Sequence, residues 1–164
     1  MECAGEPHGM LIRMVILLLL ANGAPVLAAY VFGDRLLAPI DGGRVLPDGR
    51  PLFGISKTWR GVICSIVLSA LGGAWLLHSM ALGVLIGLGA MAGDLFSSFL
   101  KRRLGKPSGS LLIGLDQVPE SLIPGLLVAS ELGLSPQILL WSVIWFSGLE
   151  LLLSWCGRRV FGRP

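Results

Sequence analysis

Charged residues are scarce in this chain. They make up 14% of its 164 residues, whereas hydrophobic residues make up 54%, and the mean hydropathy is +0.79. An ordinary soluble domain carries about 25% charged residues, so this composition excludes that class and indicates a membrane protein. We expect one integral membrane domain over residues 1–164, with an all-α fold, because a helix satisfies its own backbone hydrogen bonds in lipid.

Cysteine and histidine are also few, and their positions exclude the sites that they usually form. The three cysteines, Cys3, Cys64 and Cys156, are widely spaced, which indicates neither a disulfide framework nor a metal knuckle. His8 is near the N-terminus, and His78 falls in a loop away from the acidic residues of interest. No Walker-type nucleotide motif is present.

Long apolar runs are abundant, and they predict five membrane spans. These lie at about residues 11–32, 62–77, 82–100, 118–132 and 138–156. The first run also resembles a signal peptide with Arg13 in its basic region, but its apolar length of about 20 residues favours a spanning helix. The fourth is the weakest, because Pro119, Pro124 and Glu131 interrupt it, and a short or re-entrant segment is the alternative.

Basic residues fall almost entirely on one side of these predicted spans. They occupy the loops at about 33–61 and 101–117 and the C-terminal tail, whereas the loops around 78–81 and 133–137 contain no Lys or Arg. Lys and Arg near span ends are retained in the cytoplasm. We therefore expect the N-terminus outside, the C-terminus and both basic loops in the cytoplasm, and a location in the plasma membrane.

Asp94 is an ionisable residue inside the third predicted span. With Ser97, Ser98 and Lys101 it occupies positions i, i+3, i+4 and i+7, so these side chains share one helix face that leads to the cytoplasm. An ionisable group in a span is costly unless it is paired or hydrated, which favours a functional role. The structural alternative is that Asp94 pairs with a Lys or Arg of a facing helix.

The segment at residues 39–61 contains too much Gly, Pro and charge to be a span. Glycines allow a phosphate to approach main-chain N–H groups, and basic side chains such as Lys57 and Arg60 supply positive charge. This pattern is typical of a loop that handles an anion. The alternative is a basic loop that contacts only lipid headgroups.

Asp116 and Glu120 lie four residues apart at the start of the fourth span. Two carboxylates on one helix face, next to basic groups, suit Mg²⁺ held between protein and substrate phosphates. The structural alternative for Asp116 is a helix N-cap. Together with Asp94 and the basic loop residues, these acids are the parts needed for phosphoryl or nucleotidyl transfer.

Four motifs resemble those of the CDP-archaeol synthase family, which is related to the CTP-dependent phosphatidate cytidylyltransferases. They are "ANGAPV", "DGRPLFGISKTWRG", "GDLFSSFLKRRLG" and "LLIGLDQ", between about residues 22 and 117. The resemblance implies a polytopic fold of five helices and a Mg²⁺-dependent transfer of CMP from CTP to a lipid phosphate. The implied partners are CTP, the lipid phosphate and membrane lipids, with no nucleic acid and no prediction of the oligomeric state.

The resemblance also implies roles for individual residues. Catalytic roles fall on Asp94, Lys101, Arg102 and Asp116. Substrate-binding roles fall on Asn22, Asp48, Arg50, Lys57, Thr58, Arg60, Ser98 and Arg103. The expected metal ligands are Asp94, Asp116 and Glu120.

The chain departs from the family pattern at two places. The family has a second aspartate where this chain has Pro119, and Glu120 follows one position later. Glu120 lies on the helix face of Asp116, so we expect it to replace the lost ligand. Ser56 stands where the family has a glycine. Two other functions stay open at this point: a catalytically silent, lipid-binding relative, and a small transporter with Asp94 as its ion site.

Overall fold

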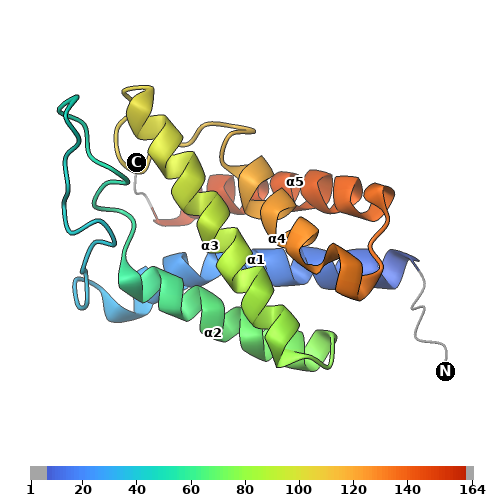
Figure 1. Ribbon diagram of the computed structural model, residues 1–164. Helices are drawn as coiled ribbons and strands as arrows, with labels where there is room; N and C mark the ends of the chain where they lie inside the picture. The colour runs from blue at the N-terminus through green and yellow to red at the C-terminus, as the bar shows by residue number, and fades with distance from the viewer. Residues whose placement is uncertain (1–6, 162–164) are drawn as a thin grey trace.

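Five helices pack into a bundle in the computed structural model, which describes residues 7–161 (Figure 1). They are α1 (Pro7–Phe32), α2 (Trp59–Leu76), α3 (Met80–Arg103), α4 (Gln117–Leu132) and α5 (Pro136–Phe161). The first loop, residues 33–58, joins α1 to α2, and the second loop, residues 104–116, joins α3 to α4. Extended pairing among residues 7–161 is limited to two isolated bridges. The predicted all-α fold is confirmed.

Four of the helices are long and apolar enough to cross a membrane. They are α1, α2, α3 and α5. Helix α4 has 16 residues and is too short to count among them, so four of the five predicted spans are supported and the fourth, the one with the weakest sequence signal, is not. The chain is a multi-pass membrane protein.

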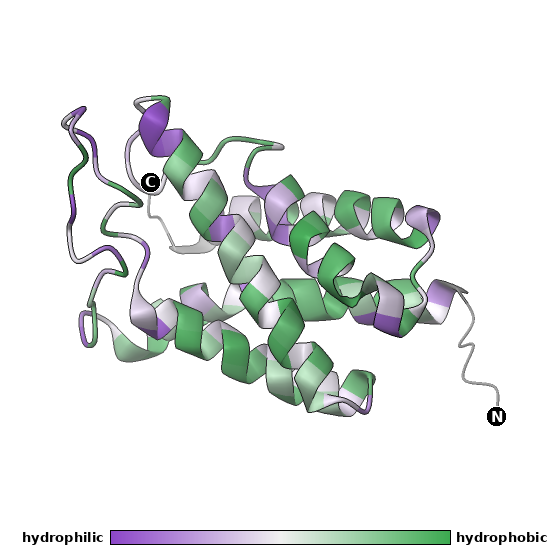
Figure 2. Ribbon diagram, viewed as in Figure 1, coloured by the Kyte–Doolittle hydropathy of each residue, from purple (hydrophilic) through white to green (hydrophobic). Residues whose placement is uncertain are grey.

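Both long loops lie at the same end of the bundle. Figure 1 shows the C-terminal ends of α1, α3 and α5 at this end, whereas the short turns between α2 and α3 and between α4 and α5 lie at the other. In Figure 2 strongly hydrophilic residues gather in the first loop and at the C-terminal end of α3, and hydrophobic residues cover most of the helix surfaces. The polar chemistry is therefore concentrated at one end. Arg163, part of the basic tail, lies outside the described residues.

Helix α1 is an integral part of the apolar core. Its residues Met14, Leu17 and Leu18 are fully buried and belong to one cluster with Ile86 of α3 and Phe146 of α5. Helix α3 packs against both α2 and α4, and α1 packs against α2 and α5. This burial agrees with the interpretation of residues 11–32 as a spanning helix.

Glycines allow α3 to approach its neighbours closely. A Cβ atom on Gly83 would collide with the Ser69 carbonyl oxygen of α2, and one on Gly93 would collide with the Pro119 carbonyl of α4. Small residues permit such backbone contact between membrane helices. Asp94, Ser97, Ser98 and Lys101 form a polar stripe on one face of α3. Because Gly93 precedes Asp94, its contact with α4 brings the start of α4 against this polar stripe.

Pro25 leaves a backbone acceptor open inside α1, and α2 supplies the donor. Proline has no N–H, so the carbonyl four residues earlier loses its helical partner. That carbonyl belongs to Ala21, and it accepts a 2.7 Å hydrogen bond from the buried Ser65 hydroxyl. One serine thereby satisfies the interrupted helix and joins α1 to α2.

Candidate functional site

The polar stripe of α3 lines a cavity of about 430 Å³ at the loop end of the bundle. Asp94, Ser98 and Lys101 contribute to its wall, together with residues of α1, both loops, α4 and α5. Ser97 and Ser98 are buried, and the Ser97 hydroxyl donates to the Asp94 carbonyl at 3.0 Å. The helical spacing therefore does bring the predicted stripe to one face, and that face borders a cavity.

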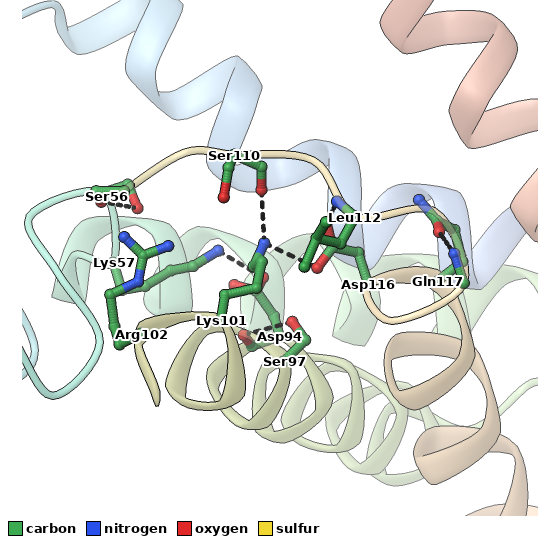
Figure 3. Close-up of polar contacts among 12 residues, drawn as sticks. Ser56, Lys57, Asp94, Ser97, Lys101, Arg102, Ser110, Leu112, Asp116 and Gln117 are labelled. Atoms are coloured by element: carbon green, nitrogen blue, oxygen red, sulfur yellow. Dashed lines mark hydrogen bonds and ion pairs between the residues drawn. The ribbon is translucent and has the colours of Figure 1, made fainter. Parts of the chain in front are cut away.

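The first loop places an ammonium group against Asp94. Lys57 Nζ lies 2.5 Å from Asp94 Oδ1, and the two side chains are 20% and 18% exposed (Figure 3). The sequence left open that Asp94 pairs with a Lys or Arg of a facing helix, but its partner Lys57 lies in the loop just before α2. Asp94 is thus paired and at the same time part of the cavity wall.

A second ion pair joins α3 to the start of α4. Lys101 Nζ lies 2.8 Å from Asp116 Oδ1, with side chains that are 8% and 7% exposed, and it donates to the Ser110 carbonyl at 2.9 Å. Asp116 also accepts a 3.0 Å hydrogen bond from Leu112 N–H. Although Asp116 stands at the N-cap position of α4, its side chain makes no capping hydrogen bond, so the N-cap alternative is wrong.

Glu120 is buried beside the first ion pair. It is only 6% exposed, it lines the cavity, and its carboxyl group lies close enough to Asp94 to interact with it. The close approach of Gly93 to the backbone of Pro119 and Glu120 makes this contact possible. The family pattern has its second aspartate at the position of Pro119. In this chain Glu120, one position later, places a carboxylate in the cavity instead.

The sequence interpretation missed Glu150, a fourth carboxylate in the cavity wall. Its Oε2 atom is buried without a hydrogen-bond partner. A signal was available, because Glu150 stands alone in an apolar span, and an ionisable residue in that setting favours a functional site. The fold brings α5 against α4, which no local pattern indicates.

The second loop is shaped by the ends of the helices that it joins. Arg102 Nη2 donates to the Pro107 carbonyl at 2.7 Å, and the Gln117 amide oxygen accepts from Gly114 N–H at 2.7 Å. Ser108 in this loop lies 3.0 Å from Ser56 of the first loop, hydroxyl to hydroxyl. Ser56, which replaces a glycine of the family pattern, therefore connects the two loops at the cavity wall.

Three of the predicted substrate-binding residues, Asp48, Arg50 and Arg103, line neither this cavity nor the smaller one beside it, and they brace the loops instead. Arg103 forms an ion pair with Asp48 and donates to the Pro51 carbonyl at 2.6 Å, and Arg50 donates to the Arg103 carbonyl. Desolvation raises the pKa of Asp48, but the Arg50 N–H and the Arg103 guanidinium together lower this pKa below its ordinary value. These side chains fasten the first loop to the end of α3.

Thr58 and Arg60 line a neighbouring cavity of about 310 Å³. Thr58 caps α2, accepting from Gly61 N–H at 3.3 Å. The buried Arg60 guanidinium donates to the carbonyls of Gly33 and Arg35 at 2.8 and 2.6 Å, so it stabilises the exit from α1. The two cavities share Lys57 and Asp94 in their walls.

Asn22 lines the larger cavity from α1. Its amide nitrogen donates to the Leu18 carbonyl of its own helix at 3.0 Å. Of the predicted site residues, the fold therefore brings eight to the larger cavity: Asn22, Lys57, Asp94, Ser98, Lys101, Arg102, Asp116 and Glu120.

The fold and the site define a polytopic helical membrane protein with an ion-paired polar cavity at one end. The family model described as CarS-like CDP-archaeol synthase matches residues 9–76 and 73–154. The chain belongs to this family.

Individual relatives agree with the family match. A CDP-archaeol synthase of Thermococcus onnurineus is 44% identical over 109 residues, which cover 60% of this chain and 61% of the relative. One of Hyperthermus butylicus is 42% identical over 113 residues, covering 65% and 64%. The aligned part thus spans about 60% of the length of these curated relatives.

A solved structure described as an intramembrane enzyme for archaeal membrane lipids biosynthesis has the same fold. It superimposes with a TM-score of 0.74 at 32% identity, covering 87% of this chain and 91% of that one. The five-helix arrangement is therefore that of an intramembrane enzyme.

Proposed function

We propose that this protein transfers CMP from CTP to an archaeol-type lipid phosphate, forming a CDP-lipid and pyrophosphate. The observation that carries the proposal is the cavity in which Lys57–Asp94 and Lys101–Asp116 meet beside Glu120 and Arg102. Acids and bases gathered in this way suit phosphates and a metal ion. The names of the relatives, CDP-archaeol synthase, support this reaction.

The reaction needs positioning and charge stabilisation rather than a protein nucleophile. An oxygen of the acceptor phosphate forms a bond to the α-phosphorus of CTP, and the bond from that phosphorus to the β-phosphate oxygen breaks. Pyrophosphate leaves with the electron pair. Lys57, Lys101 and Arg102 are the basic groups of the cavity, and we assign them to the triphosphate and acceptor charges.

The cavity fits Mg²⁺ by its donor chemistry. Four carboxylates line it, from Asp94, Asp116, Glu120 and Glu150. Glu150 Oε2 is buried without a hydrogen-bond partner, whereas the buried Asp116 Oδ1 is ion-paired with Lys101. Within residues 7–161 no three acidic, His or Cys side chains are already arranged around a metal position. Mg²⁺ usually takes only one or two carboxylates and completes its shell with water and substrate phosphates.

A charge argument also favours a metal. Each lysine of the cavity is already paired with a carboxylate, so little unpaired positive charge is available to a triphosphate that enters alone. Mg²⁺ held by carboxylates of this cavity would supply the missing positive charge and would polarise the phosphate oxygens. We propose that its one or two carboxylate ligands come from the set Asp94, Asp116 and Glu120.

The second cavity is suited to the lipid acceptor. Most of its lining is apolar, including Leu37, Ile40, Ile55, Val62 and Leu95. It meets the polar cavity at Lys57 and Asp94. A lipid whose phosphate lies at that junction would therefore have its apolar tail in the second cavity and would face the nucleotide in the polar cavity. The basic loops favour a cytoplasmic position for this end of the bundle by the positive-inside rule, and we propose that orientation, with the plasma membrane as the location.

The test is pyrophosphate release by the purified protein in detergent with CTP, Mg²⁺ and a lipid phosphate. The acceptors are a geranylgeranylated glycerol phosphate and, separately, phosphatidic acid. Lys101→Met removes a cavity base that pairs with Asp116, whereas Lys106→Met removes an exposed lysine of the second loop. We expect the wild-type protein to release pyrophosphate only when the lipid is present. Lys101→Met should abolish this release, and Lys106→Met should retain it. No release from folded wild-type protein with either acceptor would contradict the proposal.

A further inference from the structure

Asp41 is a buried carboxylate in the first loop that lines neither cavity. Its Oδ1 accepts a 2.9 Å hydrogen bond from Gly43 N–H. Its Oδ2 accepts from Phe53 N–H at 2.9 Å and from Gly54 N–H at 3.1 Å. Three main-chain donors from two distant parts of the loop thus converge on one side chain, which is 6% exposed.

These hydrogen bonds stabilise the charged form of Asp41. Burial alone would raise the pKa of this carboxyl group, but the N–H groups of Phe53, Gly43 and Gly54 lower it, and the net shift is downward. A carboxylate that accepts two or three backbone N–H groups is held ionised. Asp41 is therefore a charged anchor inside the first loop, whose extended backbone pairing is limited to two isolated bridges.

Asp41 is connected to Lys57 by two short routes. Through its carboxylate it holds Gly54, whose carbonyl accepts from Lys57 N–H at 3.2 Å. The second route runs along the main chain: Ile40 directly precedes Asp41, and the Ile40 N–H donates to the Lys57 carbonyl at 2.9 Å. The N–H of Lys57 is thus bound to the turn that the Asp41 carboxylate holds, and the Lys57 carbonyl is bound to the residue before Asp41.

The same turn is packed against the second loop. Gly54 has a φ of +96°, and a Cβ atom there would lie 2.8 Å from Ser108 Oγ and 3.8 Å from Arg102 Nη1. A side chain is therefore excluded at this position by both conformation and space. Displacement of Gly54 would open the wall that Ser56 and Lys57 contribute to the cavity.

We propose that Asp41 is a positioning residue for the transfer reaction: it orders the turn at Phe53–Gly54 so that the Lys57 ammonium group reaches Asp94 at the junction of the two cavities. This role rests on the proposed function, but the placement of Lys57 is measurable without turnover. A long loop without regular secondary structure needs such an anchor, because fixing the backbone of each residue costs conformational entropy.

The first arm of the test is labelling of lysines by an amine-reactive reagent, quantified by mass spectrometry on protein without substrate. In the wild type Lys57 is protected by its ion pair, and exposed Lys106 is the internal reference. We expect Asp41→Asn and Asp94→Asn each to raise Lys57 labelling several-fold. Asp34→Asn changes an exposed loop carboxylate and is expected to leave labelling unchanged. Asp41→Glu, which keeps the charge but moves the oxygens, is expected to give an intermediate rate.

The second arm is a double-variant cycle in the CMP transfer assay. If Asp41 acts through Lys57, Asp41→Asn lowers kcat/KM in the wild-type background but has no further effect in a Lys57→Met background. Unchanged Lys57 labelling in both Asp41 variants, or full additivity of the two substitutions, would overturn the positioning role. If the wild type makes no CDP-lipid, only the labelling arm decides, so failure of the proposed reaction and failure of this inference are distinguishable.

Discussion

The ammonium group of Lys57 and the carboxylate of Asp94 lie 2.5 Å apart and connect the first loop to the middle of α3. The two residues are 37 positions apart in the chain, and they stand where the two cavities meet. The loop is therefore part of the site wall, and the pair is the point at which loop order and site chemistry depend on each other.

Asp94→Asn should abolish most of the transfer activity. The substitution keeps the shape of the side chain but removes the charge that pairs with Lys57 and that we assign to the metal. Loss of an electrostatic contact of this kind costs at least about 100-fold in rate. Steady-state assays of Asp94→Asn beside the exposed-loop control Asp34→Asn measure the difference. Equal activities of the two variants would remove Asp94 from the mechanism.

Glu120→Gln should raise the Mg²⁺ concentration needed for half-maximal activity by about 10-fold. The neutral amide is a poorer ligand for a hard cation than the buried carboxylate. Glu131 lies on the same helix, is exposed, and lies outside both cavities, so Glu131→Gln is the matched control. Mg²⁺ titrations of the two variants compare them directly, and an unchanged Mg²⁺ requirement in Glu120→Gln would show that Glu120 does not replace the missing aspartate.

Gly93→Ala should separate α3 from the start of α4. The new methyl group would collide with the Pro119 backbone, and overpacking of this kind costs about 1–3 kcal/mol of stability. Because Glu120 would move away from Asp94, activity should fall as well. Gly148→Ala, on α5 with open space around it, should change neither thermal stability nor activity. A Gly93→Ala variant that retains wild-type melting temperature would contradict the close helix approach.

Ser65→Ala should destabilise the bundle by about 0.6–1.7 kcal/mol, the range of interhelical hydrogen bonds in membranes. It leaves the Ala21 carbonyl without the donor that compensates for Pro25. Ser69 is equally buried on the same helix, but its hydroxyl has no hydrogen-bond partner, so Ser69→Ala should be neutral or stabilising. Thermal unfolding in detergent ranks the two variants, and equal effects would refute the role of Ser65.

The helices and the polar stripe could be predicted from the sequence because they depend on local patterns. Apolar runs mark the spans, and the spacing of Asp94, Ser97, Ser98 and Lys101 places them on one face whatever the tertiary structure is. The fourth helix, whose signal was weakest, is also the one that is too short to cross a membrane.

Contacts that depend on the path of the chain in space could not be predicted in this way. Asp41 accepts from donors 12 and 13 residues further along, and its role is set by how the first loop turns back. Glu150 enters the cavity only because α5 packs beside α4. Asp48 and Arg103 matched the family motifs, yet their side chains pair with each other away from the cavity.

The most direct measurement follows the phosphates of CTP separately. CTP labelled at the α-phosphate or at the γ-phosphate is incubated with the purified protein, Mg²⁺ and a geranylgeranylated glycerol phosphate, and the lipid and aqueous fractions are counted. Cytidylyl transfer predicts that the α label enters the lipid fraction and that the γ label is released as pyrophosphate, both only when the lipid is present. Entry of the γ label into the lipid, or retention of both labels in unreacted CTP by folded protein, would contradict the account.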